Sequence, residues 1–200
     1  FVKDLQIIDA YVFITYNSEN WSEVHAGVLA GFINNYSGIS NINIHADVSI
    51  SSQTNDFITY AGLLAGRSEY ASLDRIATKG SVEAKENVGG IVGYMQYSTL
   101  KYAYTNANFS SIYNGGGIIG GVHNSQISFV YSRSVFTATT FQFHRGGIAG
   151  ETYSSTFTHV FNQSRSLQEN RYLRAVDGGN YYNSTNWKSN VYAVANGTNY

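Results

Sequence analysis

Carboxylates are the side chains from which this chain would have to build a hydrolase or lyase site. Such enzymes use paired carboxylates, or carboxylates that hold Ca²⁺, beside a base. The chain has 13 Asp and Glu residues, but none of them lies between Asn87 and Gly150. Glu83 and Glu86 come nearest to forming a pair, and we interpret them as surface charges. The sequence therefore predicts no acidic catalytic centre.

The other reactive residue types also lack the spacing that chemistry requires. The five histidines form no H-x-x-x-H pair and the chain has no cysteine, so no metal site is indicated. His25 and His144 precede glycine-rich clusters, and we interpret them as turn residues at an equivalent corner of different repeats. The glycines at 115–117 and 120–121 are followed by neither Lys-Ser/Thr nor a helical pattern, as a phosphate-binding loop would be. We expect no catalytic residue, no metal and no cofactor.

Charge and hydropathy argue against two further classes of partner. Twelve basic and 13 acidic residues give a net charge of −1, and only 12% of the residues are charged. Neither counterion release from nucleic acid nor attraction to an anionic membrane then has an obvious driving force. No apolar run approaches about 18 residues, so we expect no membrane insertion. The chain also contains no proline, which fits strands that pair on both edges.

The elements that would position any functional side chain are marked by a glycine-rich cluster that recurs five times. The clusters are AGVLAG at 26–31, AGLLAG at 61–66, GGIVGY at 89–94, GGIIGG at 116–121 and GGIAGE at 146–151. Their second positions are Gly27, Gly62, Gly90, Gly117 and Gly147, spaced 27 to 35 residues apart. A period in this range indicates a repeat architecture. We interpret these glycines as structural, because they permit sharp corners or close backbone approach.

Apolar residues follow the clusters at constant offsets. The three apolar columns are Leu5, Ile39, Leu73, Leu100, Ile127 and Phe157; Ile8, Ile42, Ile76, Ala103, Val130 and Val160; and Ile14, Val48, Val82, Phe109 and Phe136. A small residue precedes the first column by two positions, at Ser37, Ala71, Ser98, Ser125 and Ser155. Polar and apolar residues around these columns alternate with the period of a strand. Turns stacked about 4.8 Å apart would pair every strand and bury the columns.

These patterns predict an all-β fold, a right-handed parallel β-helix (β-solenoid) of about six coils. An antiparallel β-sandwich also has regularly spaced short strands, but it would not need one residue type to return at a fixed offset. We assign residues 1–200 to a single domain. It consists of a partial first coil at 1–25, glycine-cluster repeats at 26–165 and an irregular closing segment at 166–200.

Two surface features would face outward on such a solenoid. Tyr36, Tyr70 and Tyr97 fall at one offset on successive coils, which predicts either a stabilising ring stack or an exposed strip that grips sugar rings. Six N-x-S/T sequons are candidate glycosylation sites if the source is a eukaryote: Asn20, Asn35, Asn108, Asn162, Asn183 and Asn196. Asn108 precedes the inward Phe109, so we expect it to point outward. An ice-binding face would need repeated Thr-x-Thr, which occurs once, at 137–139.

The glycine clusters resemble those of the GLUG-motif repeats, whose core is followed by a Ser-containing turn and an apolar strand. The best copies are 89–94 with Ser98 and Leu100, and 116–121 with Ser125 and Ile127, and the tail at 179–184 is similar to segments that close such arrays. The resemblance covers roughly residues 5–185. It implies a secreted or surface-bound stalk, adhesin or scaffold, and it carries no catalytic residues. Two departures are the alanines of the first two clusters and the polar insert at 167–175.

Together these observations predict a non-catalytic structural or adhesive unit of an extracellular or cell-surface assembly. The alternative is a carbohydrate-binding or carbohydrate-processing β-helix. Neither end of the repeat array has a capping element in the sequence, so we expect it to pair end to end with another copy or with adjacent repeats, forming a filament or stalk. Glycans are the other candidate partner; we expect no nucleic acid.

Overall fold

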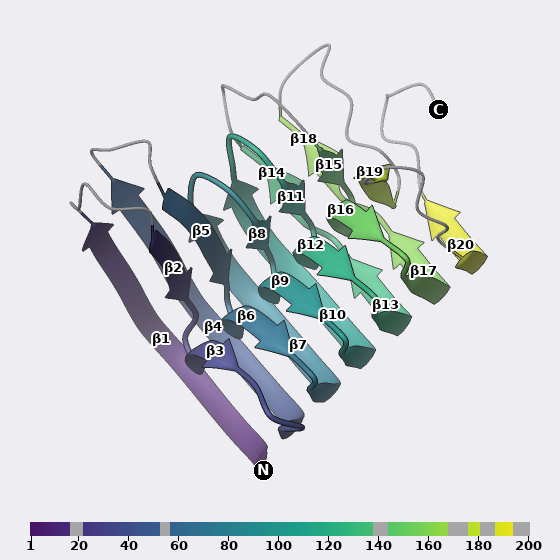
Figure 1. Ribbon diagram of the computed structural model, residues 1–200, viewed down its shortest axis with the longest axis horizontal. Coiled ribbons are helices and arrows are strands. Elements are labelled where there is room, and N and C mark those ends of the chain that lie inside the picture. Colours follow the sequence, from purple (N-terminus) through teal and green to yellow (C-terminus); the bar gives the residue numbers. More distant parts are fainter. Residues whose placement is uncertain (17–21, 53–56, 138–143, 168–175, 181–186, 194–200) are drawn as a thin grey trace.

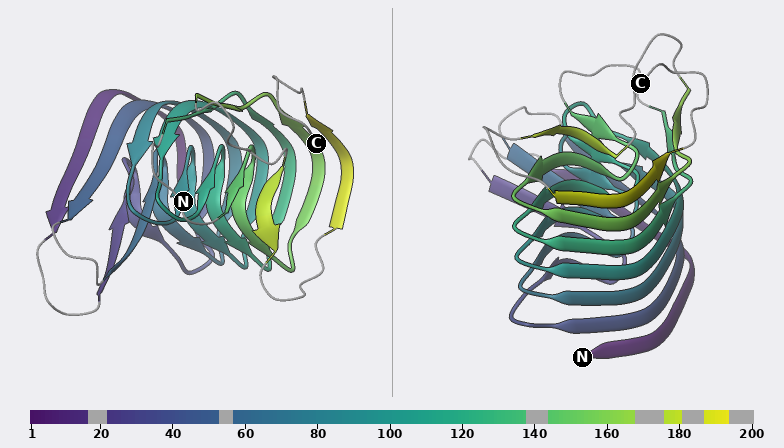
Figure 2. Two further views of the ribbon diagram at one scale, coloured as in Figure 1. Left: turned by 90° about the horizontal axis from the view of Figure 1, so that it is seen from above. Right: turned by 90° about the vertical axis from the view of Figure 1, so that its right-hand side faces the viewer.

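The computed structural model describes residues 1–16, 22–52, 57–137, 144–167, 176–180 and 187–193. In these ranges every regular element is a β-strand, and none of the described residues forms a long apolar helix of the kind that crosses a membrane. The strands wind into a β-solenoid with three parallel sheets, called A, B and C here (Figures 1 and 2). The predicted all-β class and parallel β-helix architecture are confirmed.

Sheet A contains the long strands of each coil, and sheets B and C contain the short ones. Sheet A has the order β1 (Val2–Tyr16), β4 (Gly38–Ser52), β7 (Ser72–Glu83), β10 (Thr99–Ser110), β13 (Gln126–Ser132), β17 (Thr156–Asn162) and β20 (Trp187–Ala193). Two short strands extend it: β14 (Val135–Phe136) pairs with β10, and β18 (Arg165–Ser166) pairs with β14. Sheet B has the order β2 (Ser22–Ala26), β5 (Phe57–Gly62), β8 (Val88–Gly89), β11 (Gly115–Gly116) and β15 (Arg145–Gly146). Sheet C has the order β3 (Ala30–Ile33), β6 (Ala65–Glu69), β9 (Val92–Gln96), β12 (Ile119–His123), β16 (Ala149–Tyr153) and β19 (Asp177–Asn180).

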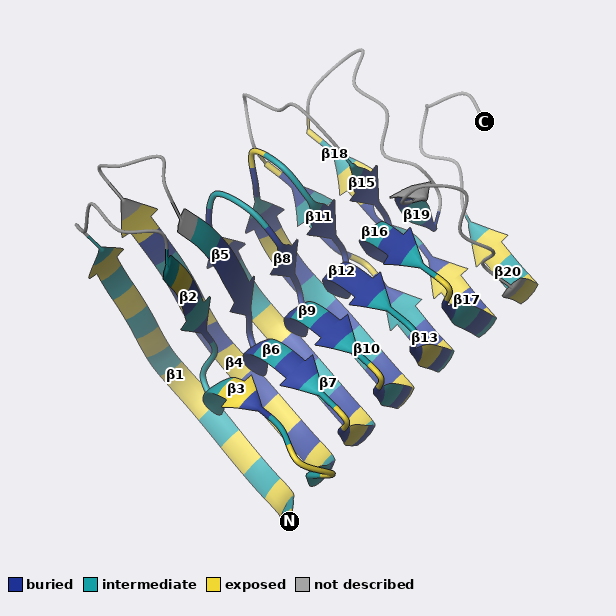
Figure 3. Ribbon diagram, viewed as in Figure 1, coloured by how far each residue is buried: buried dark blue, intermediate teal, exposed yellow. Residues whose placement is uncertain are grey.

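The predicted apolar columns form the core of the solenoid. Leu73, Leu100 and Ile127 are paired in register on β7, β10 and β13, and all three are buried. The second and third columns pair in the same way from β4 onward. Buried and exposed residues alternate along the sheet A strands (Figure 3). The residues that the sequence pattern places inside therefore line the interior from the second strand of sheet A onward.

The predicted register of the first strand is wrong. The observed pairs are Val2 with Ile39, Leu5 with Ile42 and Val12 with Val48, whereas the columns align Leu5, Ile8 and Ile14 with those partners. Ile8 lies opposite His45 instead, and its side chain is exposed. The first glycine cluster of the sequence, at 26–31, follows β1 and could not be used to set its register, and the pairing with β4 shifts by one residue between Ile8 and Ala10. Position along the chain alone could not locate this irregularity.

The glycine clusters join sheet B to sheet C. Their predicted alignment is wrong by one residue between the first two clusters and the last three. Gly62 pairs with Gly89, and Gly89 and Gly116 share their column with Gly146. The equivalent of Gly90, Gly117 and Gly147 in the second cluster is thus Leu63. A Cβ added at any of the five predicted structural glycines would meet neighbouring atoms at distances that real side chains do not show.

The small-residue column forms a hydrogen-bonded ladder at the turn into sheet A. The Ser98 Oγ accepts from the Ala71 N–H at 3.0 Å, and the Ser125 Oγ accepts from the Ser98 N–H at 3.1 Å. The Ser155 Oγ continues the ladder by accepting from the Ser125 N–H at 3.2 Å. The serine hydroxyls therefore satisfy buried backbone donors of the preceding coil.

The number of coils is smaller than predicted. About four turns separate β2, in the first coil with strands in all three sheets, from β15, in the last. The six-coil estimate includes the segments at the two ends. These contribute strands such as β1 and β20 to sheet A, with no described strand of their own coil in sheet B.

Candidate functional site

Two adjacent columns of aromatic rings cover the outer side of sheet A on its C-terminal coils. In the first column, Tyr102 stacks on Phe129 at 5.0 Å between ring centroids, and Phe129 stacks on His159 at 4.5 Å. All three side chains are exposed. The column lies on β10, β13 and β17, whose parallel in-register pairing brings equivalent positions together. Each ring therefore offers contact area to a ligand outside the solenoid.

The second column begins two residues further along the same strands. Tyr104 packs on Tyr131 at 5.4 Å, and Tyr131 packs on Phe161 at 5.2 Å. The residues between the two columns, Ala103, Val130 and Val160, are buried, so both columns lie on the outer side of sheet A. We call these six residues, Tyr102, Phe129, His159, Tyr104, Tyr131 and Phe161, the aromatic face.

The first column sits on a backbone bend that recurs along sheet A. The bend residues have φ between 51° and 55°: Asp4, Asn41, Arg75, Tyr102, Phe129, His159 and Asn190. Positive φ is uncommon for residues other than Gly, Asn and Asp, and it strains bulky side chains. Because Asp4, Asn41 and Asn190 make the same bend, the backbone does not require a ring there. The aromatic residues of the C-terminal coils thus adopt an unfavourable conformation that Asn would adopt more readily.

The predicted column of tyrosines is confirmed as a stack at another corner of the coil. Tyr36 and Tyr70 lie 5.8 Å apart between centroids, Tyr70 and Tyr97 lie 5.0 Å apart, and all three are exposed. These residues also have positive φ, as do Asn124 and Ser154 at the next two turns. The rings therefore end after three coils, and this tyrosine strip is a second exposed aromatic surface.

A hollow of about 360 Å³ adjoins the aromatic face on the outer side of sheet A. It is lined by Asn106, Arg133, Ser134, Val135, Gln163 and Arg165. The Tyr131 hydroxyl donates to the Gln163 Oε1 at 2.6 Å, which links the aromatic face directly to the lining of the hollow. We call it the arginine groove.

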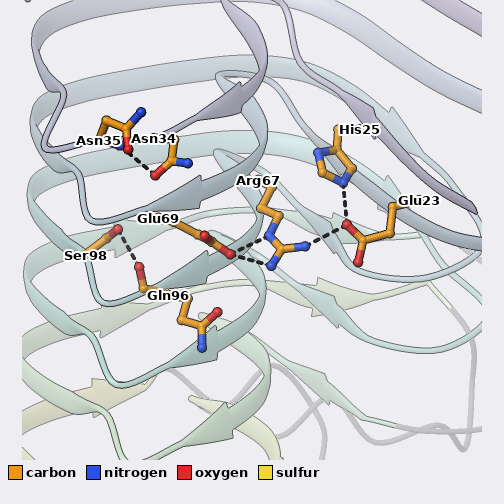
Figure 4. A network of polar contacts seen from close by, with 8 residues as sticks. All are labelled: Glu23, His25, Asn34, Asn35, Arg67, Glu69, Gln96 and Ser98. Atoms are coloured by element: carbon orange, nitrogen blue, oxygen red, sulfur yellow. Dashed lines mark hydrogen bonds and ion pairs between the residues drawn. The ribbon is translucent and has the colours of Figure 1, made fainter.

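A cluster of polar and aromatic side chains centred on Arg67 lies on sheets B and C (Figure 4). The Arg67 Nη1 donates to the Glu23 Oε2 at 2.7 Å, the Arg67 Nε donates to the Glu69 Oε1 at 2.8 Å, and His25 lies 3.0 Å from the same Glu23 oxygen. The guanidinium also lies 5.4 Å from the centre of the Tyr94 ring. Burial lowers the pKa of Arg67, but the hydrogen bond to Glu69 and both carboxylates outweigh it and raise that pKa.

Two tyrosines of the Arg67 cluster are held in the neutral form. Burial raises the pKa of Tyr94 to about 12, and burial together with the Glu23 charge raises the pKa of Tyr60 further. A general base at neutral pH needs a pKa near 7, and these phenols are far from it. The charges of Arg67 and its carboxylates are paired with one another. The cluster therefore ties neighbouring coils together and offers no activated group.

The remaining predicted chemical residues are dispersed. Within the described part of the chain, no three His, Cys, Asp or Glu side chains lie close enough to hold a metal ion. His25 pairs with Tyr60, and His144 precedes the strand of sheet B that pairs with β11, so the two histidines lie on different coils. Burial raises the pKa of Glu86, partly offset by the Lys85 charge, while Glu83 is exposed.

The sequons differ sharply in accessibility. Asn35 and Asn108 are exposed, and the outward direction predicted for Asn108 is confirmed. Asn162 is buried, its amide lies against the backbone of Gly147, and its Oδ1 accepts from the Ser164 N–H at 2.8 Å. Because Asn162 is buried, no space exists for a glycan in the folded domain, and we expect this sequon to stay unoccupied. Asn20, Asn183 and Asn196 lie outside the described residues.

Comparisons with known proteins add no relative of this chain. No protein-family model matches it, and neither a curated protein nor a solved structure matches it significantly. The functional argument therefore depends on the surface itself.

Proposed function

We propose that this domain is a non-catalytic adhesive unit of an extracellular or cell-surface assembly, and that its aromatic face binds carbohydrate. The observation that carries the proposal is the pair of adjacent ring columns on in-register strands. The first column, Tyr102, Phe129 and His159, supports the proposal further. Its rings occupy a positive-φ bend position where other coils have Asn or Asp, and they do so at a cost in backbone strain. The resemblance of the glycine clusters to GLUG-motif repeats supports the extracellular and adhesive parts of the proposal.

The chemistry of the face fits a sugar chain. Aromatic rings supply rigid apolar area to the C–H faces of sugar rings, while the Tyr104 hydroxyl can exchange hydrogen bonds with sugar hydroxyls and the Tyr131 oxygen can accept them. The columns repeat at the spacing of paired strands, about 4.8 Å. A polymer with regularly repeated units would therefore meet similar groups on successive coils.

Binding without cleavage is the form of the proposal that the surrounding residues favour. The five strands that carry the aromatic face and the arginine groove, β10, β13, β14, β17 and β18, contain no Asp or Glu. Glycosidases need two carboxylates flanking the bond that breaks. A ligand lying on these described strands meets no such pair.

A glycan array with the intact chain and a Tyr102→Asn/Phe129→Asn variant tests the proposal. Each lost ring contact is worth about 1 kcal/mol, so the double variant should bind about 30-fold more weakly. Asn tolerates positive φ, so the variant should melt no lower than the parent. The matched control is Tyr11→Asn/Phe13→Asn, which removes two exposed stacked rings from β1, three strands away from β10 in sheet A, and should bind like the parent. Absence of binding to every glycan, or unchanged binding by the Tyr102/Phe129 variant, would contradict the proposal.

A second role, end-to-end assembly, is favoured by the exposed first strand. One edge of β1 pairs with β4, and its other edge faces no described strand. Its inward residues Leu5, Ile7 and Ile14 are only partly buried. Unpaired edges and apolar ladders promote strand pairing, so we propose that β1 docks onto another copy or onto adjacent repeats. Sedimentation of an Ile7→Lys variant should show less association than the parent; a parent that stays monomeric at high concentration would refute the idea.

A further inference from the structure

The arginine groove has the geometry of a site for a small anionic group. Arg133 and Arg165 come from adjacent coils, where β13 gives way to β14 and β17 gives way to β18. Their side chains are exposed, and among the described residues neither guanidinium has an ion-pair partner. Guanidinium groups present paired N–H donors that match the oxygens of carboxylate and sulfate. Two such groups lining one hollow therefore favour an anion.

The polar neighbours of the two arginines add neutral hydrogen-bonding capacity. The Gln163 Oε1 already accepts from the Tyr131 hydroxyl, which leaves the carboxamide N–H groups of Gln163 to donate. Asn106 lines the same hollow. No Asp or Glu occurs in the strands around it, so an incoming anion meets no fixed negative charge there.

The groove continues the aromatic face along the same strands. Tyr131 and Arg133 are two residues apart and both lie on the outer side of sheet A, as strand alternation requires. A sugar packed on the rings would thus carry its substituents toward the guanidinium groups.

We propose that the ligand is an acidic polysaccharide, whose sugar rings pack on the aromatic face while a carboxylate or sulfate binds between Arg133 and Arg165. This inference rests on the proposed glycan-binding function and specifies its ligand class. Single-stranded nucleic acid also combines rings with anions. It is disfavoured because it needs a cation track along its whole backbone, whereas this domain has a net charge of −1.

The test compares three oligosaccharides by calorimetry, using protein from a bacterial host so that Asn108, beside the groove, carries no glycan. Chitohexaose is neutral, unsulfated chondroitin carries carboxylates, and chondroitin sulfate carries both anions. The parent should bind at least one acidic oligosaccharide about tenfold more tightly than chitohexaose. The two chondroitins distinguish carboxylate from sulfate recognition, and added salt should weaken only the acidic complexes.

The Arg133→Gln/Arg165→Gln variant should lose this preference while its affinity for chitohexaose stays unchanged. The control Lys3→Gln/Lys85→Gln removes the same charge from β1 and from the turn after β7, and it should keep the preference. The melting curve of the Arg133→Gln/Arg165→Gln variant should match the parent, since both side chains are exposed.

Three outcomes would overturn the inference. Equal affinity for the neutral and acidic oligosaccharides, or an acid preference that survives Arg133→Gln/Arg165→Gln, would refute the anion site and leave the glycan-binding proposal standing. Binding of none of the oligosaccharides, with none on the array, would refute both. Tighter binding of an oligothymidylate than of either chondroitin would assign the surface to nucleic acid instead.

Discussion

Replacing Gly117 with Ala tests whether the glycine clusters hold the solenoid together. A Cβ at this position would collide with the Gly147 carbonyl oxygen and the Ser132 Oγ, and would lie 3.0 Å from the Ser164 Oγ. Those two hydroxyls are hydrogen-bonded to each other at 2.7 Å, and the Ser134 Oγ donates to the Gly117 carbonyl at 3.2 Å. The new methyl group would therefore disrupt a buried network whose backbone atoms cannot move aside.

The magnitude follows from two contributions. Overpacking a tight interior site costs about 1–3 kcal/mol, and losing one buried hydrogen bond costs about 1 kcal/mol more. A loss of about 2–4 kcal/mol should lower the melting temperature of a chain of this size by about 5–15 °C. Thermal unfolding followed by circular dichroism measures the shift.

Gly121 provides the matched control on the same coil. A Cβ there would meet the Tyr94 ring at 2.9 Å and the Asn87 Oδ1 at 3.1 Å, so two side chains, and no backbone atom, would have to shift by a few tenths of an ångström. Gly121→Ala should therefore change the free energy of unfolding by less than about 1 kcal/mol, helped by the smaller backbone entropy of the unfolded chain. The reasoning fails if Gly117→Ala melts with the parent, or if the two substitutions are equally damaging.

Three further outcomes are expected. Ser125→Ala removes the acceptor of the buried Ser98 N–H and should lower the free energy of unfolding by about 1–3 kcal/mol; an unchanged urea midpoint would contradict the serine ladder. Expression in a glycosylating host should give a glycan at Asn108 and none at Asn162, as peptide mass spectrometry will show; an occupied, folded Asn162 would refute its burial. Because the folded-state pKa of Tyr94 is raised to about 12, its contribution to stability is complete below pH 10 and falls between pH 10 and about 12. Tyr94→Phe should reduce the fall in melting temperature over that range and leave the part caused by the raised pKa of Tyr60, and an unaltered pH profile would disprove the shift.

The sequence predicts the architecture because the interior repeats its residue types. Leu100, Ile127 and the serines at 98 and 125 return at one offset, so their columns can be aligned without structural information. The predicted alignment of the coils is wrong where these repeated residue types are missing. The segment before Ile8 has no cluster to anchor it, and the single glycine at Gly62 fits either of two neighbouring columns.

The candidate site is harder to predict, because its residue types differ from coil to coil. Tyr102, Phe129 and His159 each follow a core position by two residues, which is a usable signal. Their shared positive φ is not readable from sequence, since bulky residues rarely adopt it. Ordinary strand alternation, by contrast, places Asn162, two residues after the inward Val160, inside the solenoid. The arginine groove forms where β13 gives way to β14 and β17 gives way to β18. No residue pattern in the sequence predicts these interruptions.

The bend in sheet A recurs with different residue types at the bend position, so the shape of the solenoid does not depend on which outer side chain stands there. Asp4, Asn41 and Arg75 make the same bend as the three ring-bearing residues, so the row of rings can in principle be lengthened or shortened one coil at a time. Each step changes the binding surface by one strand spacing, about 4.8 Å. If the proposed aromatic face binds a polymeric ligand, affinity would then grow with the number of coils engaged, and the length of the binding row would be set by residue choice at a single position per repeat.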